Sequence, residues 1–572
     1  LFTCGVATEH CVRNSPESLL GRRLCPLTAT MASTLESSAV LSGDEIKPYR
    51  IHVSSKYLDL TKQKLELTRL PHETSEPKSR DWWEPKTQIE PLVDFWLERY
   101  DWREQEALFN DQLPQFRTAV AVPGSDSSVR LHFVHVRSPH AHAVPLLLIP
   151  PFPFTNLSLG HLIRPLAEPE DPNEQQPFHV VIPSLPGLGF SDALPSNTPV
   201  ISATAEILNL VMSRLSYTYY LVSNTSSAAS SPAEIDWKLT NHLAIGYSGS
   251  CLGAHFINPS LAAPTLKEAP LEWVKWSIAK FFRAPMLGYQ SEDIRSLGQT
   301  ELAPGRSANL SSPGPASIVE PNTPSYALCD SPVGLLALVL KVIRVLGVKK
   351  DFSAAEVITF TQTAWLPGPE AALRLWAHCL THRERVLPKP GKKPNVAITV
   401  FSGNGRGVKN GDVEAQNTPP RAAPISYVCP AWANVSYNAV HVRRVTGSPG
   451  LVAWDHPELI GEGIRGLARR LLSLDGRLKS LEQPGTAPLR GVVVVQPGST
   501  PSADQGLHPQ SPRTMPSTPQ VEATWRLERI REASETPKKA QQEEGRRAPD
   551  PDFDGASPDT IVVTPPLNEG LR

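Results

Sequence analysis

The sequence has few cysteines, no excess of charge of either sign and no long apolar run. Its seven cysteines are scattered singly, without the spacing of a disulfide framework or a metal site, which favours reduced thiols in an intracellular protein. The 56 basic and 57 acidic residues nearly cancel, which argues against a nucleic-acid-binding surface. No apolar run approaches the ~20 residues that span a bilayer, so we predict no transmembrane segment.

Proline is abundant instead, at 58 of 572 residues. We expect much of it to lie in segments that do not pack, and we predict disorder for residues 1–45 and 486–572, which lack a periodic apolar pattern. Residues 1–30 show no recognisable signal peptide, and Met31 is a candidate start. Within the tail, residues 561–567 (IVVTPPL) are either a short docking peptide or an inert segment.

Two short apolar runs organise the chain. Residues 144–149 (VPLLLI) end at a pair of prolines, and residues 179–183 (HVVIP) end at a second Pro/Gly break. Runs of this kind, with room for one helix between them, predict neighbouring strands of a buried parallel sheet. Because ligands bind at the carboxyl ends of such strands, the two breaks are candidate site loops.

The remaining pattern predicts a mostly parallel α/β fold with a helical insertion. Helical stretches with apolar faces, interrupted by a Pro/Ser/Gly-rich loop, fill residues 261–394 and predict a lid. We predict further strands at 49–53, 131–138, 218–223, 251–259, 395–403 and 436–445, and helices at 58–70, 201–215, 233–245 and 456–474, with a helix pair over 92–116.

Several motifs resemble the epoxide hydrolase family of the microsomal and fungal type. They are SLPGLGFSDA, TRLPHE, FWLERYDWREQEALFN, HFVHVRS and, in the lid, YALCDSPVGLLAL. The resemblance implies an α/β-hydrolase fold, with a meandering N-terminal arm at 46–140, the core at 141–260 and 395–485, and the lid at 261–394. It also implies a small apolar epoxide or ester as ligand, and neither a metal nor a cofactor. It leaves the oligomeric state open.

The family's chemistry requires a defined set of groups. An aspartate attacks the epoxide, because only its ester can later be cut at the carbonyl by water, and a histidine backed by a carboxylate activates that water. Two lid tyrosines donate protons to the ring oxygen, and a backbone N–H steadies the oxyanion. In the family, the nucleophile lies in a Gly-Gly-Asp motif, the histidine in Gly-His-Phe and the oxyanion turn in His-Gly-x-Pro.

The resemblance places Ser226 at the nucleophile position, where the family has aspartate. Serine would open an epoxide to an ether that water cannot release, so this position argues against epoxide turnover. A shifted alignment makes the elbow GYSGS instead, with Ser248 as nucleophile. If residues 224–231 are an insertion, Asp236 or Glu234 could serve.

The histidine position holds Gly450, because SPGLVAWDHPE matches the family's GHFAAFEEPE there. His456, at the start of the following helix, is a candidate replacement, and the alternative for it is a surface histidine. His441 lies on the preceding predicted strand and is more simply a packed residue.

Of the remaining family groups, the oxyanion N–H has a counterpart here, whereas the acid and the lid tyrosines have only candidates. Phe152 supplies the backbone N–H of the oxyanion turn, whose sequence is Pro-Pro-Phe-Pro. The acid position falls near Asp412, with Glu414 as an alternative. One lid tyrosine is replaced near residues 361–365, and the candidates for the other are Tyr326 and Tyr289. The nearby SGNGRG (402–407) has phosphate-loop glycines without the lysine, which favours a plain strand-end loop.

Three functions therefore compete. The first is an epoxide hydrolase-family protein whose epoxide hydrolysis is weak or lost. The second is a serine esterase using Ser226 or Ser248 with His456. The third is a non-catalytic protein whose apolar pocket binds a metabolite, or whose tails bind a partner.

Overall fold

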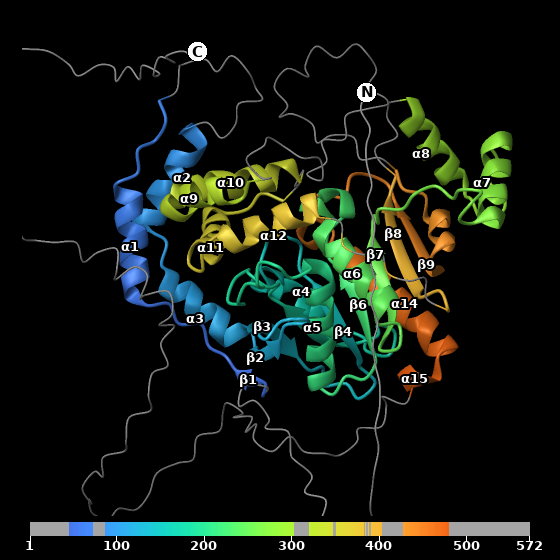
Figure 1. Ribbon diagram of the computed structural model, residues 1–572, viewed down its shortest axis with the longest axis horizontal. Coiled ribbons are helices and arrows are strands. Elements are labelled where there is room, and N and C mark those ends of the chain that lie inside the picture. Colours follow the sequence, from blue (N-terminus) through green and yellow to red (C-terminus); the bar gives the residue numbers. More distant parts are fainter. Residues whose placement is uncertain are drawn as a thin grey trace, which may run out of the picture. The chain divides into compact units, whose positions relative to one another are not determined.

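A computed structural model describes residues 45–72, 86–302, 320–346, 350–382, 384, 387, 391–402 and 427–479. Its centre is a nine-stranded sheet with the order β1-β2-β3-β5-β4-β6-β7-β8-β9. Six adjacent strands, β5, β4, β6, β7, β8 and β9, run parallel to one another. The strands β1, β2 and β3 add an antiparallel edge (Figure 1). The strands are β1 Lys47–Pro48, β2 Gln115–Ala121, β3 Ser128–Val136, β4 Val144–Ile149, β5 Phe178–Pro183, β6 Tyr220–Asn224, β7 Cys251–Ile257, β8 Asn395–Phe401 and β9 Asn438–Val445.

Helices cover both faces of this sheet, which explains the unbroken apolar runs of its central strands. Side chains alternate across a strand, so Leu147 and Ile149 of β4 pack with one set of helices, and Leu146 and Leu148 pack with the other. The first set is α5 Val200–Arg214 and α6 Ile235–Gly246, and the second is α4 Gly160–Ala167 and α14 Pro457–Leu474. The α/β-hydrolase fold class is confirmed, with the mostly parallel sheet that the sequence predicts.

The N-terminal arm lies beside the sheet and the lid. It contains α1 Ser55–Glu66, α2 Lys86–Glu98 and α3 Trp102–Gln112, so the predicted helix pair over 92–116 is present but ends earlier. The predicted strand at 49–53 is wrong, because β1 is confined to Lys47–Pro48, before that range. Here the backbone N–H groups of Ile51 and Val53 donate to side chains of α3, Asn110 and Glu106, at 2.8 and 2.6 Å rather than to a neighbouring strand.

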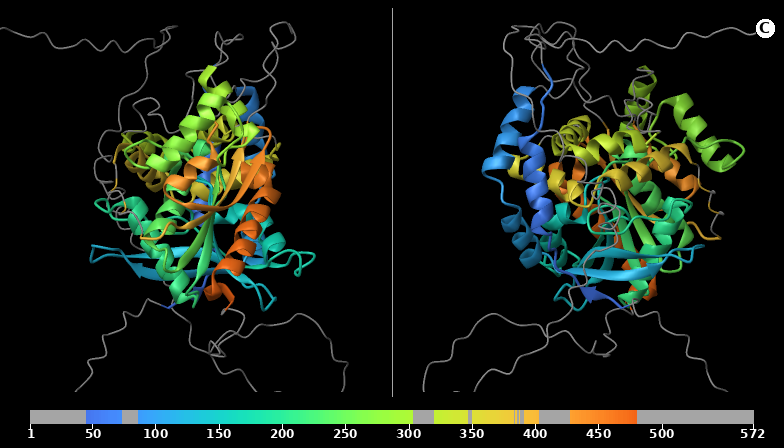
Figure 2. Two further views of the ribbon diagram at one scale, coloured as in Figure 1. Left: turned by 90° about the vertical axis from the view of Figure 1, so that its right-hand side faces the viewer. Right: turned by 60° about the vertical axis from the view of Figure 1, so that its left-hand side comes forward.

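The lid divides into two groups of helices. The helices α9 Asn322–Asp330, α10 Pro332–Val345, α11 Ala354–Trp365 and α12 Glu370–Thr381 lie over the centre of the sheet, whereas α7 Pro270–Phe282 and α8 Ser291–Leu302 lie near β8 and β9 (Figures 1 and 2). Within the predicted helical lid, Pro367, Gly368 and Pro369 separate α11 from α12.

Short elements complete the described chain: the 3₁₀ turns η1 Asn156–Leu159, η2 Ala228–Ser230, η3 Pro232–Glu234 and η5 Pro430–Val435, and the helices α13 Val452–Asp455 and α15 Gly476–Lys479. Within the described ranges, no single helix is both long and apolar enough to cross a membrane. One bent pair, Asn322–Asp330 with Pro332–Arg344, meets that test at a bend of 116°.

Candidate functional site

The turn after β6 holds Ser226, at the carboxyl end of the sheet. The chain does not pass directly from this strand into a helix. It forms η2 and η3 first, and the backbones of Ala233 and Glu234 are left-handed, with φ of 52° and 56°. These two residues end η3, and their left-handed backbone, which an α-helix cannot contain, breaks the path into α6. The helix therefore begins at Ile235, two residues later than the sequence predicts.

Asp236, the second residue of α6, contacts Ser226 across this turn. The Ser226 hydroxyl donates a hydrogen bond to Oδ2 of Asp236. The Asp236 side chain is fully buried, and its Oδ1 has no hydrogen-bond partner among the described residues. Burial raises the pKa of the Asp236 carboxyl to about 7, although the Ser226 hydrogen bond acts in the opposite direction. The structure thus brings together two of the predicted nucleophile candidates.

The rest of the turn is also buried and bonded to its own neighbours. The Asn224 side chain donates to the carbonyl of Ser226 at 2.5 Å and accepts from the N–H of Ile257 at 3.2 Å. The Thr225 hydroxyl donates to the carbonyl of Ile149 at 2.8 Å. A second amide, Asn258, donates to Ser227 Oγ at 3.2 Å. These bonds tie together the carboxyl ends of β4, β6 and β7.

Beneath the turn lies a histidine that the sequence analysis did not select. His255 of β7 is fully buried, with Nδ1 3.0 Å from Ser223 Oγ and Nε2 2.9 Å from Thr399 Oγ1. Burial lowers its pKa to about 3, so the ring is neutral. His255 lies within the apolar segment 251–257, which indicates a buried histidine. The sequence does not indicate that Ser223 and Thr399 are its partners.

Gly450, which we predict to occupy the family's histidine position, has a conformation that suits glycine. Gly450 is buried, with φ of 57°, in the loop before α13. His456 lies at the beginning of α14, where its Nδ1 is 3.5 Å from Glu458 Oε1 and its ring is 5.8 Å from that of Phe401. His441 lies on β9, where its ring packs closely over Gly466 of α14.

Ser248 lies at the opposite end of the sheet. It is an exposed residue of the turn between α6 and β7, and it precedes a strand, whereas a nucleophile elbow follows one. The neighbouring Ser250 carbonyl accepts a hydrogen bond from the N–H of Tyr220, the first residue of β6. Ser248 and Ser226 are therefore separated by the length of β6.

The lid tyrosine candidates lie apart from this turn. Tyr326 on α9 is 84% exposed. Tyr289 is buried between α7 and α8, with its ring 5.3 Å from that of Trp276. Thr361 is buried within α11 and donates to the carbonyl of Val357 at 2.9 Å. Asp412, Glu414 and the glycines of residues 403–407 lie outside the described residues.

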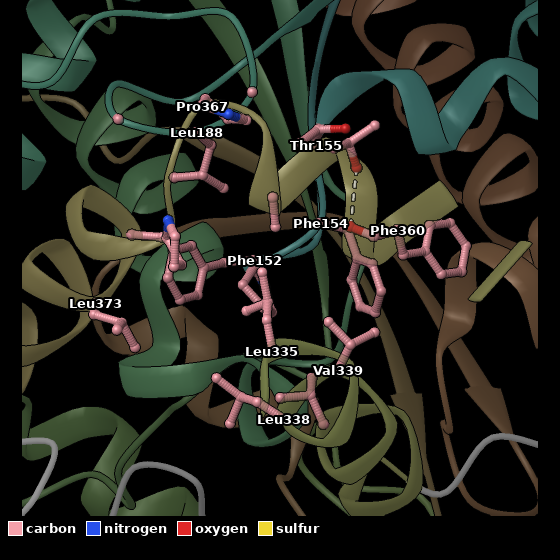
Figure 3. Close-up of a pocket in the computed structure, with 18 of the residues that line it drawn as sticks. Phe152, Phe154, Thr155, Leu188, Leu335, Leu338, Val339, Phe360, Pro367 and Leu373 are labelled. Carbon is pink, nitrogen blue, oxygen red and sulfur yellow. Dashed lines mark hydrogen bonds between the residues drawn. The ribbon is translucent and has the colours of Figure 1, made fainter. Parts of the chain in front are cut away.

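A pocket opens between the core loops and the lid, with an empty volume of about 790 Å³ that includes its opening to solvent. The core supplies Phe152, Phe154 and Leu188, which face Leu335, Leu338 and Val339 of α10 (Figure 3). The other lining residues are Pro153, Thr155, Gly187, Gly189, Val342, Phe360, Thr363, Ala364, Pro367, Gly368, Pro369, Ala372, Leu373 and Trp376.

The core side of this pocket is formed by residues of two sequence motifs, Pro-Pro-Phe-Pro and SLPGLGFSDA. The Phe152 ring packs edge-on against Trp376 of α12, with ring centroids 6.4 Å apart. In the loop after β5, Gly187 has φ of 85°, and a Cβ there would lie 2.9 Å from that of Ala371. Glycine is thus required both by the turn and by the close approach of α12.

The lining is mostly apolar. Among the described residues that form it, none is aspartate, glutamate, histidine, lysine, arginine or tyrosine, and the polar side chains are two threonines and one tryptophan. Ser226 and Asp236 are not among them. Across the described part of the chain, no three His, Cys, Asp or Glu side chains gather in a way that could hold a metal ion.

Comparison with known proteins agrees with these features. Residues 46–159 match the family described as epoxide hydrolase N terminus. A putative epoxide hydrolase of Stigmatella aurantiaca is 30% identical over 51% of this chain and 58% of its own length. Juvenile hormone epoxide hydrolase 2 of Ctenocephalides felis is 26% identical over 44% of this chain and 50% of its own length. The chain thus spans little more than half the length of these relatives.

Solved structures share the fold. The epoxide hydrolase of Aspergillus niger aligns with a TM-score of 0.54 at 17% identity, over 75% of this chain and 97% of its own. The juvenile hormone epoxide hydrolase of the silkworm Bombyx mori aligns with a TM-score of 0.54 at 19% identity, over 77% and 97%. The resemblance to the epoxide hydrolase family that the sequence motifs carry is confirmed, together with the α/β-hydrolase fold.

Proposed function

We propose that this α/β-hydrolase of the epoxide hydrolase family binds a small apolar molecule beneath its lid and hydrolyses epoxides weakly or not at all. The supporting observation is the pocket lining, which offers apolar contact on every side but no carboxylate, imidazole or phenol among its described residues. Apolar pockets with few polar groups are typical of small-molecule sites.

The turn after β6 supports the loss of turnover. Opening an epoxide through an ester needs a carboxylate that can reach the ligand, with a base near it to activate water. Ser226 is 2% exposed and its hydroxyl is bonded to Asp236, so neither group faces an open space for a ligand. Gly450 offers no base at the family's histidine position.

The test measures binding and turnover on one preparation. The purified full-length chain is mixed with a panel of aryl and alkyl epoxides, and both its melting temperature and the diol formed are followed. We expect ligands that fill the pocket to raise the melting temperature, because a ligand that binds only the folded state stabilises it by RT ln(1 + [L]/Kd). We expect diol to form at the rate seen in buffer. Rapid diol formation would refute the proposal.

A second candidate function rests on the contact between Ser226 and Asp236. If the insertion after β6 has moved the nucleophile, the ionised Asp236 carboxylate would attack an epoxide carbon and form the ester as the ring C–O bond breaks. The ring oxygen would take a proton from water, and Ser226 would position the carboxylate. This function requires that Asp236→Asn abolish diol formation and that Ser226→Ala reduce it. The serine esterase alternative requires instead that a fluorophosphonate probe label Ser226, and that Ser226→Ala remove the label.

A further inference from the structure

Helix α7 presents an apolar stripe to solvent. Leu271, Val274, Phe281 and Phe282 are 77, 43, 82 and 62% exposed. Successive residues of an α-helix are about 100° apart, so these four, with the half-buried Ile278 between them, fall on one side of the helix. Two more exposed leucines, Leu266 and Leu287, flank it. Scattered single apolar residues are common on protein surfaces, but a continuous stripe marks an interaction site.

The opposite side of α7 is fixed to the core, so the stripe cannot turn inward. Ala279 is fully buried, and the Trp276 ring lies 5.3 Å from that of Tyr289 and 5.6 Å from that of Trp432. These contacts hold α7 against η5 and the segment that leads into α8 (Figures 1 and 2).

A buried ion pair anchors the adjoining helix. Asp293 of α8 is fully buried and accepts two hydrogen bonds from Arg444 of β9, at 2.9 and 2.8 Å, and one from the Tyr427 hydroxyl at 2.5 Å. Paired and multiply hydrogen-bonded in this way, the carboxylate ties α8 to the sheet. The two helices therefore form a rigid support for the stripe.

Basic residues outnumber acidic ones in α7 and the segments that flank it. Between Leu266 and Leu287 there are four basic residues (Lys267, Lys275, Lys280 and Arg283) and two acidic ones (Glu268 and Glu272), although the whole chain carries a net charge of −1. Lys275 pairs with Glu272 at 2.7 Å, and Lys280 lies over the Trp276 ring. Lys267 and Arg283 are exposed at the two ends of the helix.

We propose that the outward face of α7 docks on the surface of an anionic lipid bilayer. An apolar stripe rich in phenylalanine, with basic residues near both of its ends, is the feature by which a helix lies in a membrane interface. The positive local charge complements an anionic surface. The site is separate from the pocket, so this proposal does not depend on what the pocket binds.

Sedimentation with lipid vesicles tests the proposal on the full-length chain. The vesicles contain phosphatidylcholine alone, or phosphatidylcholine with phosphatidylserine. We expect binding to the mixed vesicles, and we expect Phe281→Ser/Phe282→Ser to weaken it at least about tenfold, because two large apolar side chains no longer enter the interface. The matched control is Leu67→Ser/Leu474→Ser, which removes two residues of similar exposure (75 and 65%) at the ends of α1 and α14 and should not change binding.

A second pair of variants keeps the proposal testable if the serine variant folds poorly. Lys267→Gln and Arg283→Gln are exposed, and each should weaken binding to the anionic vesicles about fivefold. Raising the salt concentration should have the same effect as these variants. The proposal is overturned if the chain ignores both vesicle types, or if the α7 variants bind like the control. It is also overturned if the stripe instead joins two copies, so that Phe281→Ser/Phe282→Ser converts a dimer to a monomer in sedimentation velocity.

Discussion

Two neighbouring regions at the carboxyl end of the sheet differ in polarity: one is an apolar pocket wall and the other is a buried polar turn. The loops after β4 and β5 form one wall of the pocket and present phenylalanine, leucine, glycine and proline to it. The turn after β6 is polar and almost fully buried, and its side chains bond to one another and to the ends of the adjacent strands.

The comparison shows that binding a ligand and reacting with it place different demands on the residues. An apolar wall needs only shape and burial to hold a ligand, whereas a reacting group must be left unsatisfied by the protein and open to the ligand. The turn fails the second condition, because Ser226 and Asp236 are 2% and 0% exposed and the Ser226 hydroxyl is already donated to Asp236. Fold alone does not confer a reaction, so the α/β-hydrolase fold of this chain does not by itself imply epoxide turnover.

The largest effect is expected from Gly463→Ala, which tests how rigid the base of the polar turn is. A Cβ at Gly463 would lie 2.1 Å from Nε2 of His255, and hydrogen bonds to Ser223 and Thr399 prevent that ring from moving away. We expect the free energy of unfolding to fall by about 3 kcal/mol, measured by urea denaturation. Gly476→Ala, where a Cβ would meet nothing within 4 Å, is the control. Equal effects of the two variants would mean that the turn tolerates displacement.

Asp236→Asn should change how stability depends on pH. The folded state holds the proton of Asp236 up to about pH 7, whereas the unfolded chain releases it near 3.8. The unfolded state therefore binds fewer protons between these values, and the wild-type chain loses stability as pH rises through them. The asparagine has no such loss. We expect the variant to gain roughly 2 kcal/mol relative to wild type between pH 5 and pH 8.

Thermal or chemical denaturation at the two pH values measures this gain. Asp111→Asn, a change at an exposed carboxyl, is the control and should show no comparable gain. If the two variants respond alike to pH, the Asp236 carboxyl is not held protonated by its burial, and the polar turn is more open than the structure indicates.

Gly450→Ala should have a smaller effect. At φ of 57° an alanine is strained, so we expect a loss of about 1 kcal/mol in the free energy of unfolding. Gly391, where a Cβ would meet nothing within 4 Å and where φ is not in the left-handed region, supplies the control Gly391→Ala. A neutral result would show that this loop accepts a side chain at the family's histidine position without strain.

Val339→Trp should leave stability nearly unchanged and reduce ligand binding. Val339 is a half-buried residue of α10 that lines the pocket, and an indole there would occupy the space that an apolar ligand needs. We expect the rise in melting temperature produced by apolar ligands to disappear. Lys341→Trp, at an exposed position of the same helix, should retain it. Loss of the rise in both variants would point to general damage of the lid.

The helices and strands of the core could be predicted from the sequence, because the periodicity of apolar residues shows which side chains face the core. The run at 144–149 predicted β4, and the Leu/Ile stripe after residue 456 predicted α14, since both patterns report which side chains face the core. Side-chain hydrogen bonding is not periodic. For that reason the apolar pattern of 49–53 predicts a strand, although Asn110 and Glu106 bond the backbone N–H groups of Ile51 and Val53.

The site was harder to predict for the same reason. The contact between Ser226 and Asp236 depends on the left-handed backbones of Ala233 and Glu234, which no sequence pattern indicates. Asp236 was one of several open alternatives, and His255 was not selected at all. Placing Ser248 at the amino end of β7 required the strand register.

The most direct test of the account asks whether epoxide ever becomes attached to the turn after β6. The full-length chain is mixed with excess epoxide, quenched within milliseconds to minutes, and its intact mass is measured, with Asp236→Asn treated in parallel. We expect that neither protein gains the mass of an epoxide, with no adduct at Asp236. A wild-type mass increase of one epoxide, mapped by peptide analysis to Asp236 and missing from Asp236→Asn, would contradict it.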